Sequence, residues 1–465
     1  MNKPFWMVNL MEMFERLAYY GVRVVIPIYI AQADEIGGLH FTHDQKGTIF
    51  FWWAVFQSLT PTISGGFADR YGYKKTIAAS IAIKVIGYVL MATQHEFWPF
   101  LIGCCTLALG TAIFKPGVWG TMVHSLNKRH SSVGWGIFYM LVNVGGFLGP
   151  PLAHFLYGFS WPVVFYGCAI IVSLNFLLLF TYKDPPAGGE QVGNPFYVFW
   201  VTIKNIFDLR LIIFIVIMSG FWLMFMQLFD MLPNFIVDWV NSSAVVRDLG
   251  LPDWMLQQNS TRAPQISQEW LINANSGMII LLVVTITYIV ARMRRVHSIS
   301  LGIIAASIGL VAAGFTTSGY FCLLGILMFS VGEMLSSPKM NEYLGVIAPE
   351  GKKGLYMGYA NIPQGVGWAV GSKFAGHVYD NLGDKANLAT DYLANNFNIT
   401  DVSRTEAMNK LVELTGKSHQ QVTDLLWDTY DPYRLWYRFA AIGLVSALAM
   451  ILYARWVKKH EEPDV

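Results

Sequence analysis

The first apolar stretch of the chain, residues 5–30, carries polar side chains along one face. Relative positions 0, 3, 4, 7 and 11 are occupied by Glu12, Glu15, Arg16, Tyr19 and Arg23. In an α-helix these positions fall within an arc of roughly 100°, and Glu12 and Arg16 have the spacing of an intrahelical ion pair. A carboxylate can gain or lose a proton when its cationic partner moves away or returns. We therefore expect this face to be the polar, proton-handling lining of a cavity. The alternative is a salt-bridged helix end at the membrane interface, with the apolar span beginning near Leu17.

Other polar residues interrupt later apolar stretches. Lys115 precedes Pro116, which frees a backbone carbonyl and bends a helix. Glu333 is followed by Pro338, where we predict a break. One helical face carries three polar residues at i, i+3 and i+7: Gln227, Asp230 and Asn234. Four further charges lie in or near apolar stretches, where buried ion pairing and snorkelling are equally open: Lys84, Lys339, Glu342 and Lys373.

The composition indicates which elements must position these residues. Of 465 residues, 54% are hydrophobic and 13% are charged, against about 25% charged in soluble domains. The net charge of +2 excludes a basic nucleic-acid binder. A disordered chain and a disulfide-rich secreted module are also excluded, since the four cysteines lie in apolar stretches without framework or metal-ligand spacing. We predict an all-α polytopic membrane protein.

Twelve stretches are long and apolar enough to span a membrane, which takes about 20 residues. Six lie at roughly 5–30, 45–67, 76–93, 97–123, 133–157 and 160–182. Six more lie at roughly 211–237, 270–292, 298–316, 319–346, 355–380 and 432–456. We predict a six-helix bundle over 1–182, a cytoplasmic linker over 183–210 with an interfacial aromatic segment at 196–207, and a second six-helix bundle over 211–465.

The loops give an orientation and one additional element. Lys and Arg gather in alternate loops and in the C-terminal tail, so the positive-inside rule predicts that both termini are cytoplasmic. The long opposite loop at 382–430 is predicted to be a small helical cap, because Ser403 with Glu406 and Ser418 with Gln421 have the spacing of capping boxes. We expect this cap to shield the mouth of the bundle without chemistry of its own.

The segment GGFADRYGYKK, after the second stretch, resembles the major facilitator signature GxxxDRxGR[RK]. The matching residues are Gly65, Asp69, Arg70, Gly72 and Lys74, while Tyr73 stands where arginine is usual. The resemblance implies the major facilitator fold, with twelve transmembrane helices in two six-helix bundles. It also implies that Asp69 and Arg70 gate the cytoplasmic face.

Further motifs resemble the proton-dependent oligopeptide transporter family: EMFERLAYYG, GTAIFKP, GIFYMLVNVGGFLGP and GEMLSSP, in the order of that family. The resemblance implies that Arg23 is an external gate cation and that Glu333 receives a substrate amino group. The residues then expected to couple protons are Glu12, Glu15, Arg16, Lys115, Glu333 and Asp230. Those expected to line the substrate pocket are Tyr19, Tyr20, Arg23, Lys115, Asn143, Trp222, Gln227 and Glu333.

The seventh span departs from that family. Its stretch FWLMFMQ has Met226 where the family usually has a carboxylate. Asp230 lies one helical turn further along, and we predict that it pairs with Arg23 instead, so that these two residues form a gate.

These observations favour a secondary transporter of a bacterial inner membrane that takes up di- and tripeptides, or peptide-like solutes, with protons by alternating access. A proton-coupled exporter of a drug, siderophore or metabolite is the alternative on the same scaffold, and a non-transporting receptor is the alternative from another class. We expect no enzyme, no metal site and no cofactor besides the proton gradient, because no nucleophile–base pair or metal-ligand spacing is present. The expected partners are the lipid bilayer and a small-molecule or short-peptide substrate. We expect no nucleic-acid partner, and we expect the protein to be a monomer.

Overall fold

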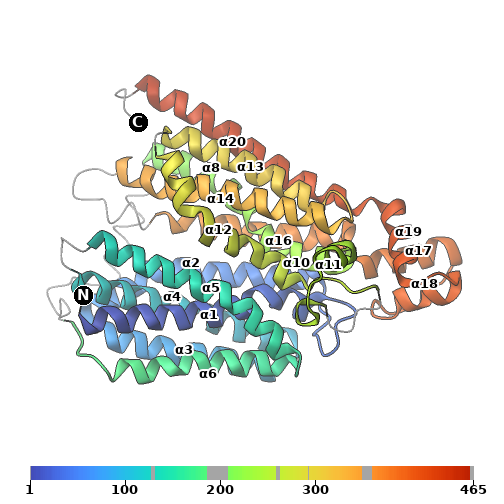
Figure 1. Cartoon of the computed structure of the whole chain (residues 1–465), viewed down its shortest axis with the longest axis horizontal. Helices are drawn as coiled ribbons and strands as arrows, with labels where there is room; N and C mark the ends of the chain where they lie inside the picture. Colours follow the sequence, from blue (N-terminus) through green and yellow to red (C-terminus); the bar gives the residue numbers. More distant parts are fainter. Residues whose placement is uncertain are drawn as a thin grey trace. The chain divides into compact units, whose positions relative to one another are not determined.

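The computed structural model describes residues 2–126, 131–185, 208–257, 262–291, 293–347 and 359–460. Within these ranges the chain is helical, with two isolated bridges in place of a sheet (Figure 1). The long helices are α1 (Lys3–Ala31), α2 (His43–Tyr71), α3 (Tyr73–Thr93), α4 (Phe97–Ser125), α5 (Ser131–Tyr157), α6 (Trp161–Leu179), α8 (Leu209–Phe225), α12 (Gln268–Val290), α13 (Arg295–Gly314), α14 (Gly319–Ile347), α16 (Asn361–Leu382) and α20 (Leu435–His460). The short helices are α9 (Gln227–Asp230), α10 (Leu232–Trp239), α11 (Ser243–Leu249), α17 (Lys385–Phe397), α18 (Ala407–Thr415) and α19 (His419–Tyr430), with 3-10 turns η3 (Asp253–Met255) and η4 (Pro432–Arg434).

The predicted all-α membrane fold is confirmed. Eleven of the twelve predicted spans each overlap one long helix, because the same run of apolar residues both forms the helix and crosses the bilayer. Nine of the described helices are long and apolar enough to cross a membrane. Helices α1, α2 and α16 are equally long but carry more polar residues.

The seventh span is not the continuous helix that its apolar run predicts. Helix α8 ends at Phe225, and two short helices, α9 and α10, follow it after single-residue breaks at Met226 and Met231. Pro233 stands in the first turn of α10, where its missing N–H cannot extend the hydrogen-bond ladder of the preceding helix. Gln227 and Asp230 share α9, whereas Asn234 follows the break at Met231, so the prediction of one face for all three stays a prediction.

The described helices form two compact units. Unit 1 comprises Met1–Arg23, Phe51–Ser219 and Leu344–Ala369, and unit 2 comprises Val24–Phe50, Gly220–Tyr343 and Val370–Val465. Five of the described helices are each divided between the units: α1, α2, α8, α14 and α16. The predicted bundle boundaries stay a prediction, because most of the linker, including its aromatic segment 196–207, lies outside the described residues.

In unit 1, α5 packs closely on α1 through glycines four residues apart. A Cβ atom on Gly145 would lie 2.4 Å from the carbonyl oxygen of Met13, and one on Gly149 would lie 2.7 Å from the backbone nitrogen of Gly21. Small residues at this spacing let membrane helices approach to backbone contact. This contact fixes the part of α1 that carries the charged residues, because the Cβ of Arg16 is also within 2.9 Å of the Gly145 position.

In unit 2, α13 packs on α20, and α17, α18 and α19 pack on one another as the predicted helical cap. The capping box of Ser418 and Gln421 is confirmed at the start of α19. The box predicted at Ser403 is wrong, because Glu406 precedes α18 and the Ser403 hydroxyl donates to its carboxylate at 2.9 Å. The break predicted at Pro338 is also wrong, since α14 continues through it; neighbouring groups in a membrane protein can satisfy the carbonyl that proline frees.

Candidate functional site

Unit 1 contains a buried cluster of charged side chains on α1. Arg16 Nε lies 3.1 Å from Glu12 Oε1, and Arg16 Nη2 forms a second ion pair with Glu15 Oε2. The guanidinium also lies 5.0 Å from the centre of the Tyr19 ring, which permits a cation–π contact. Glu12, Glu15 and Arg16 are 4%, 1% and 7% exposed. Both carboxylates therefore depend on protein cations, rather than on water, for stabilisation.

Lys84 of α3 completes this cluster. Its Nζ lies 3.5 Å from Glu15 Oε1 and 3.7 Å from the centre of the Phe114 ring on α4. Of the two possibilities left open by the sequence, buried ion pairing is confirmed, because the side chain is 1% exposed. Among the described residues Glu15 has two cationic partners and Glu12 has one. The four charged groups balance when all are ionised.

Lys115 and Asn143 lie on neighbouring elements of the same unit. Lys115, on α4, is half-buried, and within the described ranges no carboxylate comes within 4.0 Å of its ammonium. The ammonium still interacts electrostatically with the α1 cluster, because Arg16 repels it while Glu12 and Glu15 attract it. Asn143, on α5, donates from Nδ2 to the carbonyl of Tyr139 at 2.8 Å. The ammonium of Lys115 is therefore available to an anionic group.

Aromatic and polar side chains extend the polar face of α1 beyond the cluster. The Tyr19 hydroxyl accepts a hydrogen bond from Gln57 at 3.2 Å, and the rings of Tyr19 and Tyr20 meet edge to face at 5.4 Å. Further along α1, the Arg23 guanidinium lies 5.1 Å from the centre of the Trp368 ring. Since Arg23 is 2% exposed, the polar face continues along α1 as its spacing predicts.

Unit 2 holds a separate carboxylate on α14. Glu333 Oε2 accepts a hydrogen bond from Asn275 Nδ2 at 3.1 Å, and the same amide donates to Ser330 at 3.0 Å. Glu333 is half-buried, and no cation in the described part of the chain lies within 4.0 Å of it. A carboxylate in this position is stabilised by a proton or by a cationic group of a ligand.

The interrupted seventh span places its polar residues in different contacts. Asp230 accepts a hydrogen bond of 2.5 Å from Ser372 Oγ of α16, and Gln227 Nε2 donates to the carbonyl of Leu223 at 2.7 Å. Trp222 is buried among aromatic rings, with its centroid 4.9 Å from that of Phe225. The predicted pair of Arg23 with Asp230 joins residues of different units and stays a prediction.

The chain matches the family model of the Major Facilitator Superfamily over residues 8–372, which is most of its length. The chain belongs to this superfamily. It is therefore an integral membrane protein of a family of transporters, as predicted from the signature.

Curated relatives in the superfamily include drug-resistance proteins. The chain is 22% identical to Multidrug resistance protein MdtH of Klebsiella pneumoniae (strain 342) over 330 residues, covering 68% of this chain and 73% of the relative. It is also 22% identical over 329 residues to MdtH of Yersinia enterocolitica, with the same coverage of each chain.

Solved structures with the same fold include peptide transporters. Tetrameric PepTSo2 superposes with a TM-score of 0.68 at 17% identity over 99% of both chains. A POT family transporter in complex with 5-aminolevulinic acid superposes with a TM-score of 0.69 at 15% identity, covering 97% of this chain and 96% of that one. At these identities the likeness shows the fold.

The major facilitator signature lies at the turn from α2 to α3. Gly72 has φ +107°, a conformation that favours glycine. Lys74 is held by the carbonyl of Tyr182, to which its Nζ donates at 2.8 Å. Arg70 lies 5.6 Å from the Tyr71 ring, while the Asp69 side chain lies outside the described parts. The gating roles expected for Asp69 and Arg70 stay predictions.

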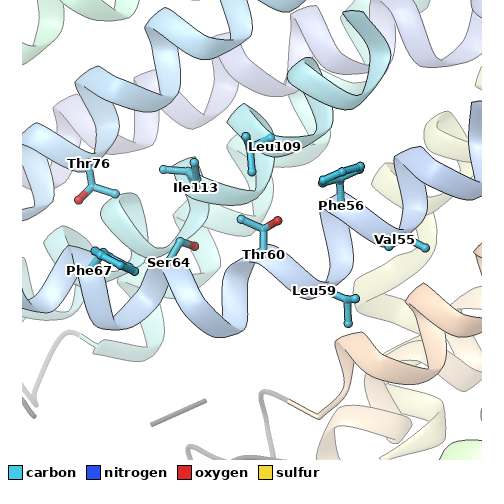
Figure 2. A pocket seen from close by; sticks show the side chains of 9 residues that line it. All are labelled: Val55, Phe56, Leu59, Thr60, Ser64, Phe67, Thr76, Leu109 and Ile113. Atoms are coloured by element: carbon cyan, nitrogen blue, oxygen red, sulfur yellow. The ribbon is translucent and has the colours of Figure 1, made fainter. Parts of the chain in front are cut away.

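An apolar cleft of about 450 Å³ lies elsewhere in unit 1 (Figure 2). It runs along α2 between residues 55 and 67, against Thr76 of α3 and Leu109 and Ile113 of α4. Its polar lining consists of the hydroxyl residues Thr60, Ser64 and Thr76. The cleft suits an aliphatic chain or a ring and cannot neutralise a charged group.

Several buried charges of unit 2 were not predicted from the sequence. Lys46, at the start of α2, donates to Asn234 Oδ1 at 2.7 Å and is 3% exposed. Asp238, at the end of α10, accepts hydrogen bonds from Gln32 and Tyr379, each at 2.8 Å. Charged residues at the ends of apolar stretches usually snorkel into water, so their burial leaves no local signal in the sequence.

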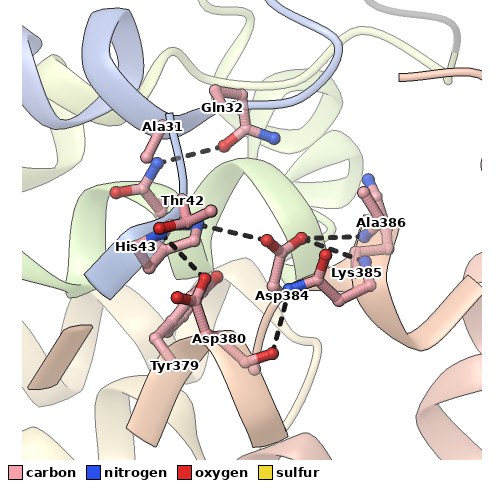
Figure 3. A network of polar contacts seen from close by, with 12 residues as sticks. Ala31, Gln32, Thr42, His43, Tyr379, Asp380, Asp384, Lys385 and Ala386 are labelled. Carbon is pink, nitrogen blue, oxygen red and sulfur yellow. Dashed lines mark hydrogen bonds and ion pairs between the residues drawn. The ribbon is translucent and has the colours of Figure 1, made fainter. Parts of the chain in front are cut away.

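A third such charge is Asp384, between α16 and the cap (Figure 3). It is the N-cap of α17 and is 2% exposed. Burial raises the pKa of Asp384 to about 6, although the nearby Arg404 guanidinium acts in the opposite direction. The only sequence signal is an aspartate three residues before Asn387, the spacing of a helix N-cap.

Proposed function

We propose that this chain is a proton-coupled symporter of small zwitterionic solutes, with di- and tripeptides as the first candidates. It would work by alternating access in a bacterial inner membrane, with both termini in the cytoplasm as the distribution of Lys and Arg predicts. The proton gradient supplies the energy, and no cofactor is required.

The observation that carries this proposal is a pair of opposite charges, Lys115 and Glu333, that form no ion pair within 4.0 Å among the described residues. The cluster of Glu12, Glu15, Arg16 and Lys84 balances its own charge, so Lys115 adds an uncompensated positive charge to unit 1. Glu333 is a negative charge in unit 2 whose carboxylate, within the described ranges, accepts a hydrogen bond from the Asn275 amide. Charges in a membrane span are expensive and are kept for function. A ligand carboxylate would suit Lys115, and a ligand amino group would suit Glu333; a zwitterion carries both groups.

The proton-coupling part of the proposal rests on the two buried carboxylates of α1. Their shared partner, Arg16, can favour one or the other, and either carboxylate can be neutralised by a proton when the cation moves away. A substrate carboxylate that binds Lys115 would change the field on this cluster. Proton occupancy and substrate occupancy are then linked energetically.

The test is uptake by purified full-length protein in liposomes with an alkaline interior. Labelled dialanine is expected to accumulate, and a protonophore should abolish the accumulation. N-acetyl-dialanine lacks the amino group that Glu333 would bind, and dialanine amide lacks the carboxylate for Lys115. Both analogues should compete at least tenfold less well than dialanine. Equal competition by all three compounds would contradict recognition of a zwitterion.

A matched pair of variants on α14 assigns the role of Glu333. Glu333→Gln is expected to reduce dialanine uptake at least tenfold. Glu342→Gln makes the same change in charge on the same helix, but at a residue paired with Arg295 at 2.8 Å near the helix end, and should leave uptake within twofold. An equal loss in both variants would indicate a general effect on α14 and not substrate recognition.

A second candidate is a proton-coupled drug exporter, favoured by the similarity to MdtH and by the apolar cleft of unit 1. The same liposomes separate the two candidates. An exporter would drive a preloaded lipophilic drug outward as protons enter, and dialanine would neither accumulate nor exchange. A receptor that does not transport would show neither movement.

A further inference from the structure

Arg404, in the turn before α18 of the cap, binds three separate segments of unit 2. Its Nε and Nη2 donate to Asp384 Oδ2, with the Nε contact at 2.8 Å. Nη2 also donates to the carbonyl of Ala31 at 2.7 Å, and Nη1 donates to the carbonyl of Phe41 at 3.2 Å. One guanidinium thus joins the last residue of α1, the chain just before α2, and the junction between α16 and the cap.

Asp384 is built into the fold on the other side of this contact. Its carboxylate accepts the backbone N–H groups of Ala386 at 2.9 Å and Asn387 at 3.4 Å, which begin α17. The imidazole of His43 lies 3.6 Å from the same carboxylate. These contacts fix Asp384 in place, so Arg404 binds a preformed acceptor. The side chain of Arg404 is 17% exposed. Figure 3 shows Asp384 between His43 of α2 and the first residues of α17.

Beneath this contact, the start of α2 is bound to the end of α16. The carboxylate of Asp380 accepts the backbone N–H group of His43 at 2.8 Å (Figure 3). It also accepts the backbone N–H group of Asp44 at 2.7 Å. A carboxylate at a helix N-terminus satisfies unpaired N–H groups and interacts favourably with the helix dipole. Lys373 of α16 also pairs with Asp44 at 2.7 Å. A Cβ on Gly376 would lie 2.3 Å from the carbonyl of His43, so the two backbones touch.

These contacts connect helices that alternating access must separate. Helices α1 and α2 belong to the first predicted bundle, while α16 and the cap belong to the second. In transporters of this superfamily, access alternates largely by rigid rocking of one half against the other. At this end, opening must therefore break the bonds of Arg404 to Ala31 and Phe41 and those of Asp380 to α2. The cap moves with α16, because Asp384 joins α16 directly to α17.

We propose that the cap is a latch, and that Arg404 is the positioning residue through which it holds this end of the transporter closed. The proposal rests on the proposed alternating-access function, and it gives the 382–430 insert a role that shielding alone does not. Its predicted effect is on the population of the open state, without any change in the substrate-binding residues. Loss of the guanidinium removes the bonds to α1 and α2 while the cap remains attached to α16.

The experiment measures opening directly in the purified full-length protein. Spin labels on Ile36→Cys and Asn381→Cys, two exposed positions on the α1–α2 loop and on α16, report the distance across this end by pulsed electron resonance. Arg404→Gln is expected to increase the long-distance population at least threefold over the otherwise unchanged labelled protein. Lys410→Gln makes the same charge change in the same cap, at a residue paired with Glu413 on α18, and should leave the distribution unchanged.

The outcomes distinguish the latch from the transport function. Equal distributions in the unchanged protein, Arg404→Gln and Lys410→Gln, with both populations present, would refute the latch and leave alternating access intact. A single fixed distance in every variant and at every pH would refute alternating access itself. If Arg404→Gln does not fold, Arg404→Lys keeps the charge but not the forked donors, and an unchanged long-distance population in that variant would equally refute the latch.

Discussion

Replacing Glu15 by glutamine would leave Lys84 buried without the carboxylate that stabilises it. The Nζ of Lys84 lies 3.5 Å from Glu15 Oε1, a distance at which two unit charges attract by about 5 kcal/mol at an effective dielectric constant of 20. The cost of removing Lys84 from water remains in the variant, because its side chain is 1% exposed. Breaking one partner of a buried pair costs about 3–5 kcal/mol, so Glu15→Gln should destabilise the protein by that order.

The double variant Glu15→Gln/Lys84→Met tests whether this loss comes from the ion pair. Methionine is close to lysine in length and carries no charge, and it can pack against the Phe114 ring that Lys84 now contacts. Removing both charges should recover at least half of the stability lost in Glu15→Gln. Lys84→Met alone should be milder than Glu15→Gln, because Glu15 keeps its pair with Arg16.

The assay is unfolding of the four proteins in one detergent, followed by tryptophan fluorescence. Glu342→Gln serves as the control, since Glu342 is 42% exposed in its ion pairs and exposed pairs are worth about 1 kcal/mol or less. Strictly additive losses in the double variant, with no recovery, would refute the reasoning. They would mean that Lys84 and Glu15 contribute independently of each other.

Three further predictions concern other parts of the chain. Gly149→Val should prevent α5 from packing on α1 and lower the yield of folded protein several-fold, while Gly136→Val on the same helix, where a Cβ meets nothing within 4 Å, should fold normally in size-exclusion chromatography. Asp230→Asn should abolish uptake driven by a proton gradient but preserve substrate exchange, and undiminished gradient-driven uptake would contradict a gating charge at Asp230. Because the pKa of folded Asp384 is about 6, above its ordinary value of 3.8, the stabilisation that this group gives at low pH should be lost as pH rises from about 4 to about 6. Asp384→Asn, which can still cap α17, should flatten that part of the pH–stability curve, and an unchanged curve would contradict the shift.

The long helices could be predicted because each is specified by a continuous run of its own residues. The span of α4, for example, follows from its apolar residues between Phe97 and Ser125, whatever the rest of the chain does. The stripe on α1 could be predicted for the same reason, since helical periodicity alone puts Glu12, Glu15 and Arg16 on one face. Local pattern and final structure agree where one helix contains the whole signal.

The remaining features depend on residues that are far apart in the sequence. The break after Phe225 leaves the run of apolar residues uninterrupted, so hydropathy cannot detect it. Arg404 stands in a polar loop, and its acceptors at Ala31, Phe41 and Asp384 come together only in the folded chain. Lys46 resembles an interfacial lysine until Asn234 is found 2.7 Å away. None of these contacts has a local signal.

The asymmetry within the α1 cluster bears on which carboxylate exchanges the proton. Both carboxylates pair with Arg16, but Lys84 adds a second cation to Glu15 alone among the described residues. Protonating Glu15 would therefore strand Lys84 in a buried position, at the cost estimated above. Protonating Glu12 leaves Arg16 with Glu15 and leaves Lys84 fully paired. We therefore expect Glu12 to exchange the proton during transport and Glu15 to remain an anion that holds α1 and α3 together.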